Sequence, residues 1–393
     1  MTDRPDGAAM TAASARPGDD HRGLRVAFVV GLASGGTAAH VGSLAAGCQD
    51  AGVAVTVLAP APTARLLRAA VDTVPVTIGG RPRPGRDVRS VVRLRSWLTG
   101  WRPDVVHAHG VRAGALTAVA LALTRRAGRP GLVITVHNAP PDKRAAGLVY
   151  AVLERICARR ADLVLCASAD LLARMRSRGA GEAELFDVPA GPYRPPTAAD
   201  TAAVRREISG DGRPVVLAVG RLAPQKGLDV LIEAAARWRD RDPRPVTVIA
   251  GAGPLAAALA AKARQSDGDV RLLGPRGDVP ALLAVADVVV VPSRWEARAL
   301  IVQEAMRAGR PIVATLVGGI AQLTGADGAV LVPPADPAAL AAAVTAVLDD
   351  AALADRLGRA ARARSTAFPT EQDALRAALA GYARLADRRR GRG

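Results

Sequence analysis

The sequence contains few aromatic residues, few cysteines and no long apolar run. Phe, Trp and Tyr make up 3% of its 393 residues, which argues against a site that stacks nucleic-acid bases on aromatic rings. Its three cysteines, Cys48, Cys157 and Cys166, form no CxxC pair and no metal-ligand spacing. We therefore expect buried thiols in a reducing compartment. The longest clean apolar run, residues 113–123, is shorter than the roughly 20 residues that a membrane-spanning helix needs.

Lysine is also scarce, although the chain is strongly basic. Lys143, Lys226 and Lys262 are the only lysines among 53 basic residues, which face 36 acidic ones and give a formal net charge of +17. No recognisable motif for nucleic acid accompanies this charge, so we expect no nucleic-acid partner. Residues 1–22 are polar and lack the apolar core of a signal peptide. We expect them to form a disordered tail on a soluble, cytoplasmic protein.

The hydrophobic pattern indicates an α/β protein. Half of the residues are hydrophobic and the length suggests two domains. Short β-branched runs alternate with longer Ala/Leu/Arg stretches, an order typical of parallel sheets covered by helices on both faces. The predicted strands are 24–30, 53–58, 104–107, 132–137, 163–166 and 184–188, and after a break 214–219, 246–250, 270–273, 287–291, 311–314 and 329–332. The predicted helices are 37–50, 87–100, 111–126, 143–160, 168–178, 225–239, 254–266, 278–285, 299–308, 337–348 and 351–365.

The break between the two runs of strands is rich in proline, at 189–196, and cannot continue a helix or a central strand. We predict two Rossmann-like domains, 23–190 and 201–368, joined by a linker at 191–200. A final helix, 369–388, is expected to pack back on the first domain. Ligands of open α/β sheets bind beyond the carboxyl ends of the strands. The cleft between two facing sheets is therefore where we expect the chemistry.

The first candidate site follows the strand at 214–219. It reads Gly220-Arg221-Leu222-Ala223-Pro224-Gln225-Lys226-Gly227. Arg221 and Lys226 emerge at a strand end beside a helix N-terminus, an arrangement that suits phosphate because backbone N–H groups and the helix dipole add to the positive charge. Arginine can clamp phosphate with two hydrogen bonds, whereas lysine acts as a point charge. The alternative is an ordinary solvated helix start.

The second candidate site follows the apolar strand at 287–291. Glu296 should lie in the loop at the strand end, and Glu304 lies on the next helix among Ile301, Val302 and other apolar residues. A carboxylate there is costly to bury unless it is hydrogen-bonded, and a ribose diol would be a suitable partner. The alternative is a glutamate that simply faces solvent.

The first predicted domain contributes glycines and histidines. Gly35-Gly36 follows the first strand but does not form GxGxxG, so a hydride-transfer site is only weakly supported. His40 falls inside the next helix, where a structural role is expected. His107 and His109 lie on one strand face, at i and i+2, and His137 ends the following strand. With no third ligand nearby, zinc is not expected. His137 is a candidate for an acceptor side of the cleft.

Together these motifs resemble the retaining nucleotide-sugar glycosyltransferases of family 4, which have the GT-B fold. In that family a strand–GRLxxxKG–helix motif precedes a Glu-x7-Glu motif, and Glu296 and Glu304 have that separation. The stretches 308–315 and Gly318-Gly319 also look like the family. The resemblance covers residues 24–385 and implies GT-B architecture, with two Rossmann-like domains facing a cleft.

The resemblance also assigns roles to single residues. It implies that Arg221 and Lys226 neutralise the donor diphosphate. Glu304 would bind the ribose hydroxyls and Glu296 the hydroxyls of the transferred sugar. By the same resemblance, His109 is the active-site histidine, and the Gly35-Gly36 loop approaches the donor phosphates and the acceptor.

One segment departs from the family pattern. Where the family often has Glu-Gly-Phe-Gly, this chain has Glu296-Ala297-Arg298-Ala299. Backbone N–H groups of this segment would face the donor sugar, but Ala297 and Ala299 restrict dihedral angles that glycine allows. Arg298 is expected to add a cation near the sugar or the diphosphate. We expect this change to bear on donor identity more than on fold.

The function implied is transfer of a sugar from a UDP- or GDP-sugar to an acceptor hydroxyl, with retained anomeric configuration, in cell-envelope glycan, glycolipid or polysaccharide biosynthesis. Arg221 and Lys226 would act where other enzymes use a metal, so neither metal nor cofactor is expected. A non-catalytic GT-B protein that binds a nucleotide-sugar and a nucleotide-sugar epimerase are the alternatives. The acceptor stays open between a polyprenyl-linked glycan, a phospholipid and a small metabolite.

Residues 87–100 suggest where the protein works. Arg86, Arg89, Arg93 and Arg95 accompany an apolar helical face there. A basic amphipathic helix of this kind can dock on anionic lipid. Peripheral contact with the inner face of the plasma membrane is therefore one expectation. A helix that covers the sheet and solvates its arginines is the other.

Overall fold

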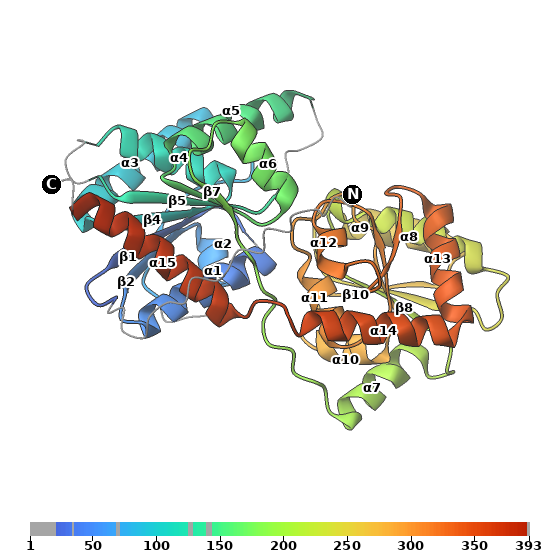
Figure 1. The fold of residues 1–393 in the computed structure, drawn as a ribbon. Coiled ribbons are helices and arrows are strands. Elements are labelled where there is room, and N and C mark those ends of the chain that lie inside the picture. The colour runs from blue at the N-terminus through green and yellow to red at the C-terminus, as the bar shows by residue number, and fades with distance from the viewer. Residues whose placement is uncertain (1–20, 34, 68–70, 125–128, 139–143, 391–393) are drawn as a thin grey trace, which may run out of the picture.

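The computed structural model describes residues 21–33, 35–67, 71–124, 129–138 and 144–390. The predicted tail therefore lies almost wholly outside the described residues, as does Lys143. Within these ranges the chain forms two parallel sheets with helices on both faces (Figure 1). The prediction of an α/β protein, with parallel sheets covered by helices on both faces, is confirmed.

The first sheet has seven parallel strands in the order β3-β2-β1-β4-β5-β6-β7. Its strands are β1 Arg25–Val30, β2 Ala54–Ala59, β3 Thr73–Pro75, β4 Val105–His109, β5 Gly131–Val136, β6 Leu163–Cys166 and β7 Ala183–Leu185. Its helices are α1 Gly36–Asp50, α2 Ala61–Ala64, α3 Pro84–Trp101, α4 Val111–Ala122, α5 Arg144–Arg160 and α6 Ala169–Ser177. Helices α3 to α6 contact one another in sequence and cover one face of this sheet.

The second sheet has six parallel strands in the order β10-β9-β8-β11-β12-β13. Its strands are β8 Val215–Val219, β9 Val246–Ala250, β10 Val270–Gly274, β11 Val288–Val291, β12 Ile312–Thr315 and β13 Val330–Val332. Its helices are α7 Ala198–Ser209, α8 Leu228–Ala235, α9 Ala256–Gln265, α10 Val279–Val285, α11 Leu300–Arg307, α12 Ile320–Thr324, α13 Pro337–Asp349 and α14 Ala351–Ser365, with short 3-10 turns η1 Pro224–Lys226 and η2 Ala236–Trp238.

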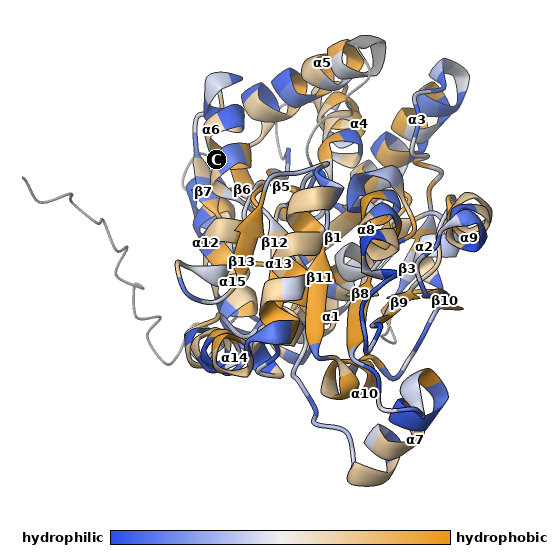
Figure 2. Cartoon of the chain, turned by 90° about the vertical axis from the view of Figure 1, so that its right-hand side faces the viewer, coloured by the Kyte–Doolittle hydropathy of each residue, from blue (hydrophilic) through white to orange (hydrophobic). Residues whose placement is uncertain are grey.

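Each face of the second sheet has its own core. Val215 and Leu217 pack into one buried cluster, whereas Val216 and Ala218 pack into the other. This alternation follows from the two-residue period of a strand, which sends successive side chains to opposite faces. Because both faces are buried, the strands read as continuous apolar runs, and the orange strands of Figure 2 show this.

The last helix, α15 Glu371–Arg390, lies against the first sheet. It contacts α1, β4 and β5, and Leu379, Tyr382 and Leu385 belong to the buried core of that half of the molecule. The chain therefore crosses between the two sheets twice, once before α7 and once before α15 (Figure 1).

Several elements differ from the sequence predictions. The linker was predicted to run to residue 200 and no helix was predicted directly after it, but α7 begins at Ala198, where Thr197 and Asp200 form a capping box. The predicted helix 225–239 is divided into η1, α8 and η2, and Gly227, with a φ of 60°, separates η1 from α8. Strand β3 and helices α2 and α12 have three to five residues. They were missed because so short a segment carries no readable period.

No single helix among the described residues is both long and apolar enough to cross a bilayer. Helices α13 and α14 meet the length and composition criteria only as a pair, and they are bent by 100° at the break between them.

Candidate active site

The two sheets approach each other at the carboxyl ends of β1 and β11. A Cβ atom added to Gly36, at the start of α1, would lie 2.4 Å from Leu300 Cδ1, at the start of α11. Nearby, Trp295 Nε1 donates a hydrogen bond of 2.9 Å to Asp170 Oδ2 on α6. Gly36 of the predicted glycine pair therefore lies against the start of α11, directly after the loop that carries Glu296.

The core of the candidate site is an ion pair between Lys226 and Glu296. Lys226 Nζ lies 2.6 Å from Glu296 Oε1, and Ser293 Oγ donates a second hydrogen bond of 2.6 Å to the same oxygen. Glu296 is buried, with a relative exposure of 5%. The structure thus joins two motifs that lie 70 residues apart in the sequence. The pair holds an ammonium group and a carboxylate where β8 and β11 end.

Two glycines allow the loops around this pair to pack closely. Gly227 has a φ of 60°, and an added Cβ would lie 2.0 Å from Pro292 O. Gly318 has a φ of 50°, and its Cβ would lie 1.9 Å from Glu296 O. Any side chain at either position would collide with backbone, so only glycine permits these contacts.

The segment that departs from the family pattern adopts ordinary backbone angles. Ala299 caps α11 with a φ of −69°, and among the described non-glycine residues only Arg102 and Ala335 have positive φ. Ala297 and Ala299 therefore need none of glycine's extra freedom. The Arg298 guanidinium pairs with Asp187 Oδ1 at 2.8 Å and lies 5.9 Å from the Phe368 ring. Its pKa is lowered by burial.

The two remaining donor-side candidates, Arg221 and Glu304, are more accessible to solvent than Glu296. Arg221 is exposed and follows directly on the end of β8 and Gly220. Glu304 is partly buried on α11, and burial raises the pKa of its carboxyl group, with Arg307 acting in the opposite sense. Among the described residues no side chain or backbone group hydrogen-bonds to that carboxylate.

Four histidines form a buried cluster at the carboxyl ends of β1, β4 and β5. The rings of His109 and His137 stack with centroids 5.5 Å apart, and His109 Nδ1 lies 3.2 Å from His137 Nε2. The His40 ring stands edge-on to both. His109 Nε2 and His40 Nε2 are buried and have no hydrogen-bond partner in the part of the chain that the structure describes.

Burial keeps these histidines neutral. It lowers the pKa of His40 to about 4 and that of His137 to about 3, with His40 as a further cause. Burial also holds the pKa values of His107 and His109 well below their ordinary range. A neutral imidazole can donate a hydrogen bond from one nitrogen and accept one at the other. The cluster therefore offers polar atoms without net charge.

His107 and His40 complete the cluster, and a structural role was expected for both. His107 is hydrogen-bonded on both sides, to Tyr382 Oη and to Thr135 Oγ1, each at 2.6 Å. These contacts use both of its nitrogens within the protein. The His40 ring contacts those of His109 and His137, which could not be predicted from its position inside a helix. Only the packing of α1 against β4 and β5 brings these rings together.

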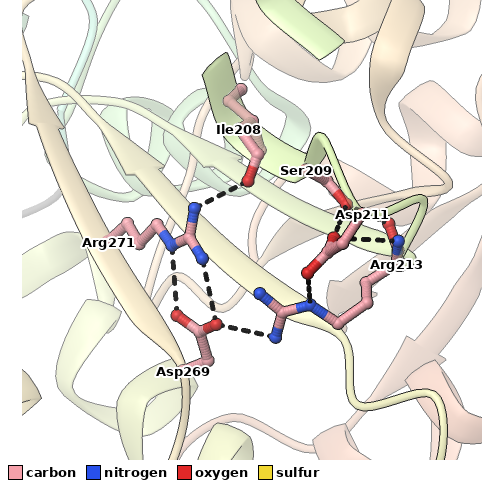
Figure 3. Close-up of polar contacts among 6 residues, drawn as sticks. All are labelled: Ile208, Ser209, Asp211, Arg213, Asp269 and Arg271. Carbon is pink, nitrogen blue, oxygen red and sulfur yellow. Dashed lines mark hydrogen bonds and ion pairs between the residues drawn. The ribbon is translucent and has the colours of Figure 1, made fainter. Parts of the chain in front are cut away.

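No three His, Cys, Asp or Glu side chains among the described residues are grouped as a metal site. Two Asp-x-Asp spacings, Asp240/Asp242 and Asp267/Asp269, lie near the opposite, amino edge of the second sheet. Figure 3 shows Asp269 there, between Arg213 and Arg271. Arg271 in turn donates to Ile208 O at 2.7 Å. This network ties α7 to β8 and β10, away from Lys226 and Glu296.

Comparisons with known proteins identify the two halves of the chain. Residues 35–191 match the family model of the glycosyl transferase 4-like domain, and residues 213–350 match that of glycosyl transferases group 1. Glycogen synthase of Mycobacterium tuberculosis is 34% identical over 296 residues, 71% of this chain and 69% of that protein. The 2-deoxystreptamine N-acetyl-D-glucosaminyltransferase of Streptomyces fradiae is 30% identical over 351 residues, 74% of this chain and 83% of that protein.

A solved structure shows the same fold. HepE of Anabaena, solved in complex with UDP and glucose, aligns with a TM-score of 0.78 at 20% identity, covering 92% of this chain and 99% of that one. Together with the two parallel sheets, this alignment confirms the GT-B architecture.

Proposed function

This chain belongs to the family 4 glycosyltransferases with the GT-B fold, and we propose that it uses a UDP- or GDP-sugar with retention of anomeric configuration. It is a transferase that acts in glycan biosynthesis, in keeping with its glycosyltransferase relatives. The same relatives favour group transfer over the epimerase and the non-catalytic binding protein. HepE, which binds UDP and glucose, supports a nucleotide-sugar donor.

The observation that carries the proposal is the Lys226–Glu296 ion pair. A diphosphate placed beside η1 gives the Lys226 ammonium a second anionic partner. Glu296 Oε2 is then available to accept a hydrogen bond from a sugar hydroxyl, while Ser293 holds Oε1. One contact thereby sets the distance between the diphosphate and the sugar.

The remaining donor-side residues are consistent with a diphosphate placed beside η1. Arg221 is exposed in the loop that leads from β8 to Lys226 and can form two hydrogen bonds with a phosphate. Gly227 opens α8, whose first N–H groups add positive potential at the same place. Glu304 has a carboxylate whose raised pKa reflects burial, and we assign it to the ribose hydroxyls.

The chemical step breaks the bond between the anomeric carbon and the β-phosphate oxygen. The acceptor hydroxyl forms the new bond on the same face of the sugar ring, and its proton passes to the departing phosphate oxygen. Arg221 and Lys226 stabilise the charge that develops on this leaving group, which is the task of preorganised electrostatics. We assign His109 Nε2 to the transferred sugar and His137 to the acceptor side. No metal or cofactor is part of this proposal.

We further propose that the enzyme acts in the cytoplasm, peripherally at the inner face of the plasma membrane. The names of its relatives include a polysaccharide synthase and a 2-deoxystreptamine glycosyltransferase. Similarity alone therefore does not select the acceptor.

The test is a thermal-shift screen of the purified chain against UDP, GDP, ADP, TDP and their sugars, without metal. A ligand at about 100 times its dissociation constant adds about 2.7 kcal/mol to the stability of the folded state. We expect one base to raise the melting temperature, and Lys226→Ala to abolish the shift.

Rates give the second measurement. Arg221→Ala and Lys226→Ala should each lower kcat/KM by at least about 100-fold, the size of effect seen when one electrostatic donor is removed. Lys262→Ala is the matched control, because Lys262 pairs with Glu233 on the surface. Near-normal turnover in either site variant, or no shift with any nucleotide, would refute the proposal.

A further inference from the structure

Helices α3 and α5 expose large aliphatic side chains to solvent. On α3, Val88 and Val92 are 63% and 61% exposed, and on α5 Leu148, Val152 and Val149 are 71%, 54% and 44% exposed. Single exposed aliphatic residues are normal, but groups at helical spacing mark interaction surfaces. We call these five residues the aliphatic rim.

Exposed arginines continue the same helical stripes. On α3 the stripe runs Val88, Val92, Arg95, and on α5 it runs Leu148, Val152, Arg155, Arg159, with spacings of three and four residues. The exposed arginines of the two helices are Arg86, Arg89, Arg93, Arg95, Arg155, Arg159 and Arg160.

Carboxylates do not balance this charge at the surface. Among the described side chains of α3, α4 and α5, the acidic ones are Asp87 and Glu154. Asp87 pairs with Arg112, and Glu154 is fully buried beside Arg174 and Arg178. No exposed acidic side chain lies on these three helices within the described residues, so the face is uniformly basic.

The aliphatic rim lies on the cleft side of the first sheet. Helices α3 and α5 each follow a parallel strand and therefore begin at the carboxyl edge, where the candidate site is. Four of the five aliphatic residues fall in the first half of their helix, and Val152 lies at the midpoint of α5. Both helices pack on α4, so they lie about 16–20 Å apart at the usual helix spacing. In Figure 2 both project at the top of the molecule with mixed orange and blue turns.

We propose that α3 and α5 dock the protein on an anionic lipid bilayer and that the acceptor is carried by that bilayer. The aliphatic rim enters the headgroup region, and the seven arginines bind anionic headgroups around it. Charge complementarity selects this occupant, because a basic face with apolar side chains and no exposed carboxylate matches an anionic membrane surface. The acceptor assignment rests on the proposed transferase function, whereas the docking surface does not.

The test is flotation of the full chain with vesicles of phosphatidylcholine alone or with about one-third phosphatidylglycerol. We expect binding only to the anionic vesicles, weakening as salt rises. Arg89→Glu with Arg93→Glu should lower the partition coefficient more than about 25-fold, since each arginine near the surface contributes roughly fivefold. Val88→Asp with Leu148→Asp should lower it at least about tenfold.

Matched controls are Arg356→Glu on α14 and Leu123→Asp, an exposed leucine at the far end of α4. Neither should change vesicle binding. All variants should keep the nucleotide-induced thermal shift of the parent, which shows that they fold. Equal binding to both vesicle types, equal loss in the control variants, or dimers in place of vesicle binding would overturn the docking surface.

The same experiment separates the two proposals. Vesicle binding without any nucleotide effect contradicts the proposed donor but leaves the docking surface standing. A nucleotide effect without vesicle binding refutes the docking surface alone. Transfer to a water-soluble acceptor that is as fast as transfer to acceptors extracted with lipid would refute the assignment of the acceptor.

Discussion

At the scale of single residues, burial governs the histidine cluster. His40, His107, His109 and His137 all have pKa values lowered first by burial. The unfolded chain therefore binds more protons than the folded chain at mildly acidic pH. Stability from this cluster is complete above the ordinary histidine pKa of about 6.5 and is lost as pH falls toward the folded values, about 4 for His40 and 3 for His137.

We expect the free energy of unfolding to fall steeply between pH 6.5 and 5. Each histidine contributes up to about 1.4 kcal/mol per pH unit below its unfolded pKa. His137→Gln removes one such group and should make the dependence shallower by up to that amount. Urea unfolding at pH 7, 6 and 5 measures both slopes. An unchanged slope in the variant would show that His137 is not the neutral, buried group described above.

At the scale of elements, Gly227 determines where the helix after β8 begins. Its left-handed φ ends η1 and starts α8 in a new direction. Its missing side chain lets the turn approach Pro292. In this arrangement Lys226, at the end of η1, contacts Glu296.

Gly227→Ala should therefore disrupt the site as well as the turn. We expect loss of the nucleotide-induced thermal shift and a destabilisation above about 2 kcal/mol, from strain and collision with backbone. Gly274→Ala is the matched control. Gly274 also has a positive φ, of 71°, but nothing lies within 4 Å of its added Cβ. Gly274→Ala should therefore lower stability only through backbone strain and should keep nucleotide binding. Equal effects at both positions would argue against the collision at Gly227.

At the scale of the whole molecule, α15 ties the end of the chain to the first sheet. Tyr382 is almost fully buried, and its hydroxyl contacts His107 Nδ1 at 2.6 Å. Arg384 and Arg388 pair with Glu182, and Arg389 with Asp162. Helix α15 thus supports the strand that presents His109.

Tyr382→Phe should leave His107 Nδ1 buried and unpaired, at a cost of about 1–3 kcal/mol. Tyr193→Phe is the matched control, since the described residues offer the Tyr193 hydroxyl no hydrogen bond and its loss should be nearly neutral. Thermal unfolding of the two variants beside the parent measures the difference. A stable Tyr382→Phe protein would show that the hydrogen bond contributes little.

The sequence by itself determined the α/β class, most strands and the candidate donor motifs. Apolar runs reveal strands buried on both faces, and Arg221, Lys226, Glu296 and Glu304 lie in motifs that are local in sequence. Helix α7 was not predicted, and α8 was predicted as part of one longer helix, because single residues such as Thr197 and Gly227 decide where these helices begin.

Only the tertiary structure decided which of these residues meet. The Lys226–Glu296 contact joins loops 70 residues apart, and the histidine cluster gathers side chains from α1, β4 and the end of β5. Tertiary packing also decided three further features. These are the packing of α15 on the first sheet, the ion pair of Arg298 with Asp187 and the joint surface of α3 and α5. Hydrophobic periodicity specifies which side of an element is buried. The packing of whole elements determines which other element covers it.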